Sequence, residues 1–295
     1  MVTKPVPNTA RWEGLIACLW FLLVDALLLN WALRRPVDAV KFVLFFILIA
    51  TIPFLVYLLY RTWAAFSLEY WADRNAVTIR WATGKQVIPI NAITRILRGI
   101  NDLEEPGWRY WPTPYVRPGR ALGLLNVNLF ATRPLAECLL LETEGGTYAL
   151  SPREPDAFLA DLQNRYRMGP ARTFPLRQES PPDGRRLLGE GNVGPILLGL
   201  GLLGIFIVVG LLMAQFPFLP DGLTADYDGD GIPDLVREKS SLFLLPAMGI
   251  LAWLINGLWG LWLVRREQAT GAYMLWGGAV VVQICSIMAL VSFIR

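Results

Sequence analysis

Histidine is absent from the 295 residues of this chain. Its absence excludes a Ser-His-Asp or Cys-His catalytic triad, a His-Glu-x-x-His zinc site and a histidine-ligated haem. The three cysteines, Cys18, Cys138 and Cys285, are far apart in the sequence and form neither a Cys-x-x-Cys motif nor a recognisable disulfide framework. A nucleophile motif and a phosphate-binding glycine loop are also missing, so we expect a protein that is not an enzyme.

Charged residues are scarce. They make up 17% of the chain, whereas an ordinary soluble domain has roughly 25%. The formal net charge is +3, and the lysines and arginines are spread out rather than gathered in a run that would follow phosphates, so we expect no nucleic-acid partner. Hydrophobic residues make up 54% of the chain, which indicates long apolar segments.

Five apolar runs are each long enough to cross a bilayer, which takes roughly 20 helical residues. A cleavable signal peptide is the alternative for the first run, but no small-x-small cleavage site follows it and a second run comes at once. The sequence therefore predicts a multi-pass cell-membrane protein in contact with lipid. The five runs are Gly14–Leu33, Phe42–Tyr60, Val193–Phe216, Ser241–Val264 and Gly271–Ile294.

The distribution of lysine and arginine gives a predicted orientation. Five crossings put the two ends of the chain on opposite sides, and the side that holds the soluble middle has slightly more basic residues near the membrane. The positive-inside rule then places the soluble domain in the cytoplasm. Residues 220–240 and the C-terminus are expected outside.

Three polar residues interrupt the apolar runs: Asp25, Asn256 and Gln283. An aspartate at the centre of a membrane helix is unfavourable by roughly 2.5–3.5 kcal/mol on insertion scales. One interpretation is a proton or ion site, or a polar contact from Asp25 to Asn256 or Gln283. The other is an inward-facing aspartate, protonated or hydrogen-bonded, that only fixes helix packing.

Apolar and polar residues alternate in short runs between Trp63 and Arg167, with turn-forming Gly, Asn or Asp residues between the runs. Ser151 and Glu154 then have the Ser-x-x-Glu spacing of a capping box, which predicts a helix to about Arg167. This pattern predicts a small all-β barrel or sandwich closed by one helix. The alternating runs are Phe66–Trp71, Ala76–Trp81, Gln86–Ile90, Cys138–Thr143 and Thr147–Leu150.

Three segments of this region resemble the bacterial pleckstrin-homology-like domains over about residues 65–168. They are Asn75-Ala-Val-Thr-Ile-Arg, Gln86-Val-Ile-Pro-Ile-Asn-Ala-Ile and Thr147-Tyr-Ala-Leu-Ser-Pro-Arg-Glu-Pro-Asp-Ala-Phe-Leu. The resemblance implies a seven-stranded barrel with a capping helix, usually membrane-attached and cytoplasmic. It does not imply phosphoinositide binding, because the sequence has no basic loop pattern of that kind.

The predicted fold is a membrane protein of five transmembrane helices, two before and three after an inserted pleckstrin-homology-like barrel. Residues 1–62 form the transmembrane hairpin and residues 63–169 the barrel with its capping helix. Residues 170–192 form a polar linker rich in Pro, Gly and Arg. Residues 193–295 form the three-helix module, which carries an acidic loop at 220–240.

Aromatic and basic residues gather in a long segment, Gly99–Pro134, that breaks the alternating pattern. Such a segment can dip into lipid headgroups or hold a ligand. The alternative is an inserted loop folded against its own barrel. The candidate contact residues are Trp108, Arg109, Tyr110, Trp111 and Tyr115.

Carboxylates recur in the acidic loop at Asp226, Asp228, Asp230 and Asp234, with glycine at position 6. Positions 1, 3, 5 and 9, with the carbonyl of Ile232 at position 7, match the first part of an EF-hand-type calcium loop. Position 12 is an arginine here instead of an acid, so the expected dissociation constant for Ca²⁺ is on the order of 10⁻⁴–10⁻³ M. The alternative is a solvated Asp-Gly turn.

The same loop resembles part of an uncharacterised bacterial membrane module that also occurs in the sporulation-delay immunity protein family. The resemblance covers about residues 200–265, and Asp226 stands where that module usually has a histidine. The matching positions are Tyr227, Asp228, Gly231, Pro233, Asp234 and Lys239.

These features together favour a non-enzymatic membrane protein of envelope sensing or regulation, or a scaffold that binds a protein partner or a second copy of itself. Two alternatives stay open. One is a transporter or an immunity-type protein that uses its polar intramembrane residues, and the other is an accessory subunit of a larger membrane complex.

Overall fold

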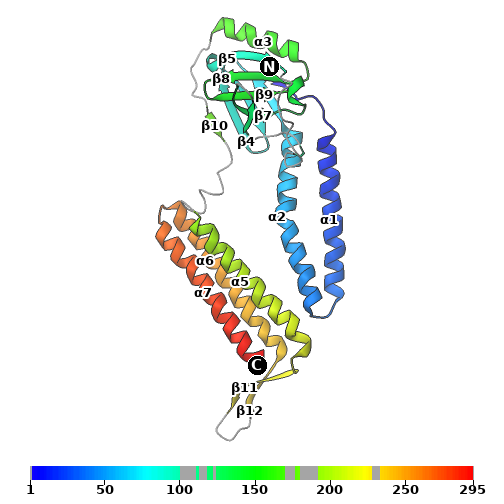
Figure 1. Ribbon diagram of the computed structural model, residues 1–295, viewed down its shortest axis with the longest axis vertical. Helices are drawn as coiled ribbons and strands as arrows, with labels where there is room; N and C mark the ends of the chain where they lie inside the picture. Colours follow the sequence, from blue (N-terminus) through cyan, green and yellow to red (C-terminus); the bar gives the residue numbers. More distant parts are fainter. Residues whose placement is uncertain are drawn as a thin grey trace. The chain divides into compact units, whose positions relative to one another are not determined.

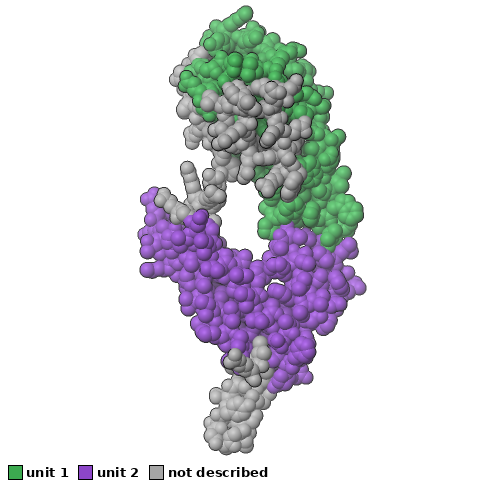
Figure 2. Space-filling model, in the orientation of Figure 1, with its two compact units in different colours: residues 1–24, 52–181 green, residues 25–51, 182–295 purple. Residues whose placement is uncertain are grey.

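The computed structural model describes residues 2–99, 111–112, 118–121, 124–169, 177–179, 192–227 and 233–294. The chain forms two compact units, which Figure 2 colours separately. One holds residues 1–24 and 52–181, and the other holds residues 25–51 and 182–295. Residues of the first helical hairpin fall in both units.

Five long apolar helices form where the apolar runs predict them (Figure 1). Each is long and apolar enough to cross a membrane. Many of their large apolar side chains are exposed, as expected when lipid rather than protein covers them. These helices indicate a membrane-associated protein. Their bounds are α1 Ala10–Arg34, α2 Ala39–Ser67, α5 Val193–Gln215, α6 Leu244–Arg265 and α7 Ala269–Ile294.

The first β-sheet combines strands from three separate parts of the sequence. Its order is β1-β2-β3-β4-β10, and all its neighbouring strands are antiparallel. β1 comes from residues before α1, and β10 comes from the segment predicted to be a linker. The bounds are β1 Val2–Thr3, β2 Glu69–Ala72, β3 Ala76–Trp81, β4 Gly84–Pro89 and β10 Arg177–Glu179.

The second β-sheet has the order β5-β8-β9-β7-β6, with a parallel pair formed by β7 and β9. The two sheets together have ten described strands, more than the seven that the resemblance implied. Two of the additional strands, β1 and β10, extend the first sheet at its two edges. The bounds are β5 Ile93–Arg98, β6 Pro118–Ala121, β7 Leu124–Phe130, β8 Leu139–Thr143 and β9 Gly146–Leu150.

Helix α3, Pro155–Met168, packs on the core that the two sheets share (Figure 1). Its Phe158 and Leu162 are buried there, and Leu159 is partly buried against them, which confirms the predicted apolar face. The first sheet contributes Tyr70 and the second Leu141, both fully buried. Burying an aromatic or aliphatic side chain of this size stabilises the fold by roughly 1.5–3 kcal/mol.

The predicted capping box at the start of α3 is wrong. The helix begins at Pro155, its N-cap is Glu154, and no side chain caps it. Proline suits this first position because it has no N–H to satisfy and its φ is already helical. Ser151 instead lies buried and accepts a hydrogen bond from the backbone N–H of Thr132 at 2.8 Å. The Ser-x-x-Glu spacing therefore does not form a cap here, because the Ser151 hydroxyl is engaged by a residue distant in the sequence.

Glycines allow close packing among α5, α6 and α7. Trp276 on α7 is fully buried against Gly260 of α6, and its Nε1 donates to the carbonyl of Gly257 at 3.3 Å. Trp253 on α6 lies over Gly201 of α5. Small residues at such positions let apolar helices approach each other and gain van der Waals contact.

Candidate functional site

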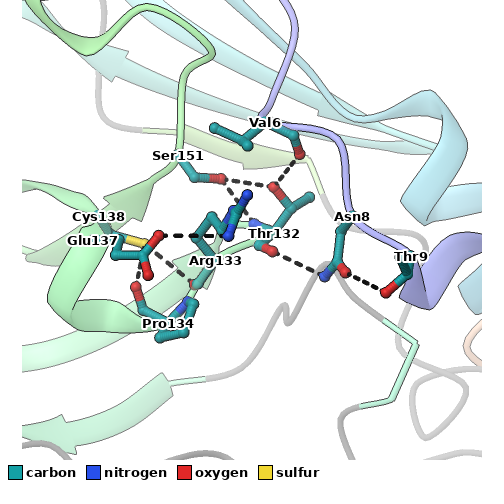
Figure 3. Close-up of polar contacts among 9 residues, drawn as sticks. All are labelled: Val6, Asn8, Thr9, Thr132, Arg133, Pro134, Glu137, Cys138 and Ser151. Carbon is teal, nitrogen blue, oxygen red and sulfur yellow. Dashed lines mark hydrogen bonds and ion pairs between the residues drawn. The ribbon is translucent and has the colours of Figure 1, made fainter.

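The segment before α1 is built into the two-sheet domain. β1 pairs with β2, and the backbone N–H of Val6 donates to the carbonyl of Ser151 at 2.9 Å. The side chain of Asn8 donates to the carbonyl of Thr132 at 2.9 Å, and the Thr132 hydroxyl donates to the carbonyl of Val6 at 2.7 Å (Figure 3). Residues 2–8 are therefore an integral part of this domain.

Buried hydroxyl groups join this segment to the core. The Tyr70 hydroxyl donates to the carbonyl of Phe130 at 2.5 Å and accepts from the Ser151 N–H at 3.2 Å. The hydroxyls of Ser151 and Thr132 lie 3.0 Å apart. Burial raises the pKa of Tyr70 well above its usual value, so this phenol stays a hydrogen-bond donor. This cluster is structural and has no nucleophile next to a base.

Cys138 lies beside this cluster, and its thiol donates to the carbonyl of Pro134 at 3.2 Å (Figure 3). Burial and, to a smaller extent, the nearby charge of Glu137 together raise the pKa of Cys138 to about 12. Thiolate is the reactive form of cysteine. The thiol is therefore inert at neutral pH, and it is a packing residue rather than a nucleophile.

We expect the domain to lose stability as the pH rises from 9 to 11. The pKa values of Cys138 and Tyr70 are higher in the folded domain than in the unfolded chain. The two groups therefore lose their protons at a lower pH in the unfolded chain than in the folded domain. The free energy of unfolding should be unchanged up to about pH 9 and should fall by roughly 2–4 kcal/mol between pH 9 and 11. Melting of wild type and Cys138→Ala at each pH checks this. The variant should have the shallower pH dependence, and equal slopes would contradict it.

Trp111 and Pro112 dock onto the ends of α1 and α2. The indole Nε1 of Trp111 donates to Glu13 on α1 at 3.0 Å, and the Arg61 guanidinium donates to the Pro112 carbonyl at 3.1 Å. Trp111 also packs against the buried cluster of Cys18, Leu55 and Leu58. The other candidate headgroup contacts, Trp108, Arg109, Tyr110 and Tyr115, lie outside the described residues.

The predicted intramembrane polar residues have different partners. Asp25 accepts a hydrogen bond from the Thr51 hydroxyl of α2, at 3.1 Å to each carboxylate oxygen. Gln283 on α7 is buried and donates to the carbonyl of Gly249 on α6 at 2.8 Å. Asn256 is half-buried on α6. The hydrogen bond of Asp25 joins α1 to α2, and that of Gln283 joins α7 to α6. Both contacts suit a role in holding neighbouring helices together.

The acidic loop contains a β-hairpin whose strands are β11 Gly222–Tyr227 and β12 Pro233–Glu238. At its base Lys239 forms a 2.8 Å ion pair with Asp221, and this bond lowers the pKa of that carboxyl. Asp226 and Asp234 fall on the two strands, while Asp228, Asp230 and Ile232 lie outside the described residues. Among the residues that the structure describes, no group of three or more acidic or cysteine side chains could hold a metal ion.

If the loop binds calcium, millimolar Ca²⁺ should raise the melting temperature, because an ion that binds only the folded state stabilises it. At ten times the dissociation constant the stabilisation is about 1.4 kcal/mol. The Asp228→Ala/Asp230→Ala double variant should lose the shift. Mg²⁺ at the same concentration is the control. The prediction fails if Ca²⁺ has no effect on wild type or the same effect on the double variant.

A groove lies between β5 and α3, with a volume of about 390 Å³. β5 is an edge strand, and it pairs with β8 on one side only among the described strands. The lining of the groove combines apolar side chains with two arginines. Its lining residues are Ile90, Ile93, Thr94, Arg95, Ile96, Leu162, Gln163, Tyr166 and Arg167. No pattern in the sequence singled these residues out, because the groove depends on which strand forms the sheet edge.

No curated protein and no solved structure matches this chain. One family does match in part. Residues 68–166, about a third of the chain, match the family model of the bacterial PH domain. The match runs from just after α2 to near the end of α3 and includes every lining residue of the groove between β5 and α3 except Arg167. The two-sheet domain is therefore PH-like, and five apolar helices accompany it.

Proposed function

We propose that this chain is a non-enzymatic integral membrane protein that presents a PH-like domain at the cytoplasmic face of the membrane and recruits a protein partner there. Envelope sensing or regulation is the setting that this architecture suits. The proposal draws on the five apolar helices and on the PH-like match.

The main observation behind this proposal is that both ends of the α1–α2 hairpin are attached to the PH-like domain. α2 ends at Ser67, Leu68 is buried in the domain core, and β2 begins at Glu69. At the other end, hydrogen bonds from Val6 and Asn8 hold the chain just before α1. A hairpin mounted at two points leaves its domain little freedom to swing, which suits a domain that presents a surface at a set distance from the bilayer.

Accessibility labelling tests the membrane part of the proposal. A cysteine placed at Glu144, an exposed turn residue between β8 and β9, should react with a membrane-impermeant maleimide only after the cells are permeabilised. Native cysteines are replaced by serine in the background chain. Labelling in intact cells would place the domain outside and contradict the proposal.

Affinity purification from native membranes tests the recruitment part. A stable partner should co-purify with the full-length protein in detergent, in amounts comparable to the bait. Purification with and without Ca²⁺ separates a calcium-dependent partner from a constitutive one. Recovery of the chain alone, as a monomer, would contradict the scaffold.

A further inference from the structure

The two sheets of the PH-like domain have one long edge strand among the described strands. The other three edges end in β1, β6 and β10, which have two, four and three residues. β5 has six residues and no proline. An edge strand presents unpaired backbone N–H and C=O groups that can accept a further strand. Short strands limit such pairing at three edges, whereas β5 is longer and is irregular only between Ile93 and Arg95.

Helix α3 lies beside β5 (Figure 1), and residues of both elements line the groove. The space between them, about 390 Å³, falls in the range of roughly 300–1,000 Å³ that is typical of ligand pockets. Ile93 and Ile96 of β5 are only half-buried, and Tyr166 of α3 is 63% exposed. Apolar side chains are therefore available to a ligand on both walls of the groove.

The charge of the groove is positive. Arg95 and Arg167 line it, and the lining includes no acidic residue. Arg95 is held by Glu142 at 2.8 Å, and Arg98 just beyond the groove is paired with Asp156. Arg167 forms no ion pair with any residue in the described part of the chain, so its guanidinium is available to an acidic ligand. Arg74 already occupies the end of α3, where it donates to the carbonyls of Met168 and Gly169.

We infer that this groove binds an extended, acidic segment of a partner protein, which adds to β5 as a further strand and packs its alternate side chains against α3. This mode takes its affinity from main-chain hydrogen bonds and its specificity from the side-chain pockets. The inference rests on the proposed recruitment function and names the surface that performs it. The available backbone edge favours a peptide over a lipid headgroup, because a lipid has no backbone to pair with β5.

A phage-displayed library of random nonapeptides, selected on the full-length protein in detergent micelles, tests this. Enriched peptides should contain Asp or Glu and alternate apolar side chains. Methylating every second backbone nitrogen of an enriched peptide should abolish its binding, because a strand cannot pair without those donors. No enrichment, or full binding by the methylated peptide, would overturn the inference.

Two groove variants and one matched control complete the test. Arg167→Glu and Tyr166→Ala should each weaken binding of an enriched peptide about tenfold or more. Arg153→Glu, which makes the same charge change outside the groove, should leave it unchanged. These side chains are exposed, so we expect the three variants to fold as wild type does. An unchanged melting temperature verifies this. Equal binding by wild type and Arg167→Glu would overturn the inference.

Two further outcomes separate the groove from the broader function. If dioctanoyl phosphatidylglycerol binds with the same dependence on Arg167 and displaces the peptide, the groove is a lipid site and the inference fails. If a native partner co-purifies equally with wild type and Arg167→Glu, the groove inference fails while the scaffold stands. If neither chain retains a partner, the proposed function itself fails.

Discussion

Replacing Gly260 with leucine should disrupt the packing of α5, α6 and α7. A Cβ atom at this position would overlap the indole of Trp276, which is fully buried and has no space to move into. Inserting side-chain atoms into a closely packed interior costs roughly 1–3 kcal/mol and sometimes more. The variant should also lose the hydrogen bond from Trp276 to the carbonyl of Gly257.

Thermal unfolding in detergent, followed by tryptophan fluorescence, measures this effect. The expected fall in melting temperature is about 10 °C. Gly278→Leu on α7 is the matched control, because a Cβ there meets no atom within 4 Å. It should melt within a degree or two of wild type. Similar melting temperatures for the two variants would mean that Gly260 is not the tight contact described above.

Replacing Tyr70 with alanine should have the largest effect on the PH-like domain. The ring is fully buried in the core, and its hydroxyl joins the Phe130 carbonyl to the Ser151 N–H. Truncating a buried aromatic costs roughly 3–5 kcal/mol. The lost hydroxyl also leaves two buried backbone groups unpaired, which costs about 1–3 kcal/mol for each uncompensated group.

Tyr70→Phe separates the two contributions, because it keeps the ring and removes only the hydroxyl. Limited proteolysis of the full-length protein reports on both variants. Cleavage within residues 68–166 should be fast in Tyr70→Ala, slower in Tyr70→Phe and slowest in wild type. Tyr166→Ala, at an exposed position on α3, should resist cleavage as wild type does. If Tyr70→Phe were as sensitive as Tyr70→Ala, the hydroxyl would matter more than the packing of the ring.

The sequence predicted those parts of the fold that depend on local pattern. Every apolar run became a helix, and β3 spans the six residues, Ala76–Trp81, whose alternation predicts it. α2 continues past the predicted end at Tyr60 to Ser67, because Ala64 and Ala65 are buried and Ala64 joins the domain core. Hydropathy marks the part of a helix that is apolar enough for a membrane, and it does not mark where protein packing extends that helix.

The sequence did not predict the features that depend on distant partners. β1 has two residues, too few to show an alternating apolar and polar pattern. It forms because it can pair with β2 at the edge of the first sheet. The hydroxyl of Ser151 accepts a hydrogen bond from the Thr132 N–H and does not cap α3, although the Ser-x-x-Glu spacing predicted a helix cap. The groove beside β5 follows from a strand order that brings β8, and no other described strand, next to β5. The docking of Trp111 on α1 depends in the same way on chain folding.

The pairing of β1 with β2 also sets an order of events during synthesis. Residues 2–8 are made before α1, whereas their partners in β2 and around Ser151 are made after α2. If α1 and α2 cross the membrane as proposed, the PH-like domain can complete its first sheet only after both helices have been made and the chain has returned to the side where residues 2–8 lie. Under that proposed topology, β1 can pair with β2 only when both ends of the hairpin lie on one side, and a chain with a misinserted hairpin would keep an unpaired sheet edge that exposes it to aggregation or proteolysis.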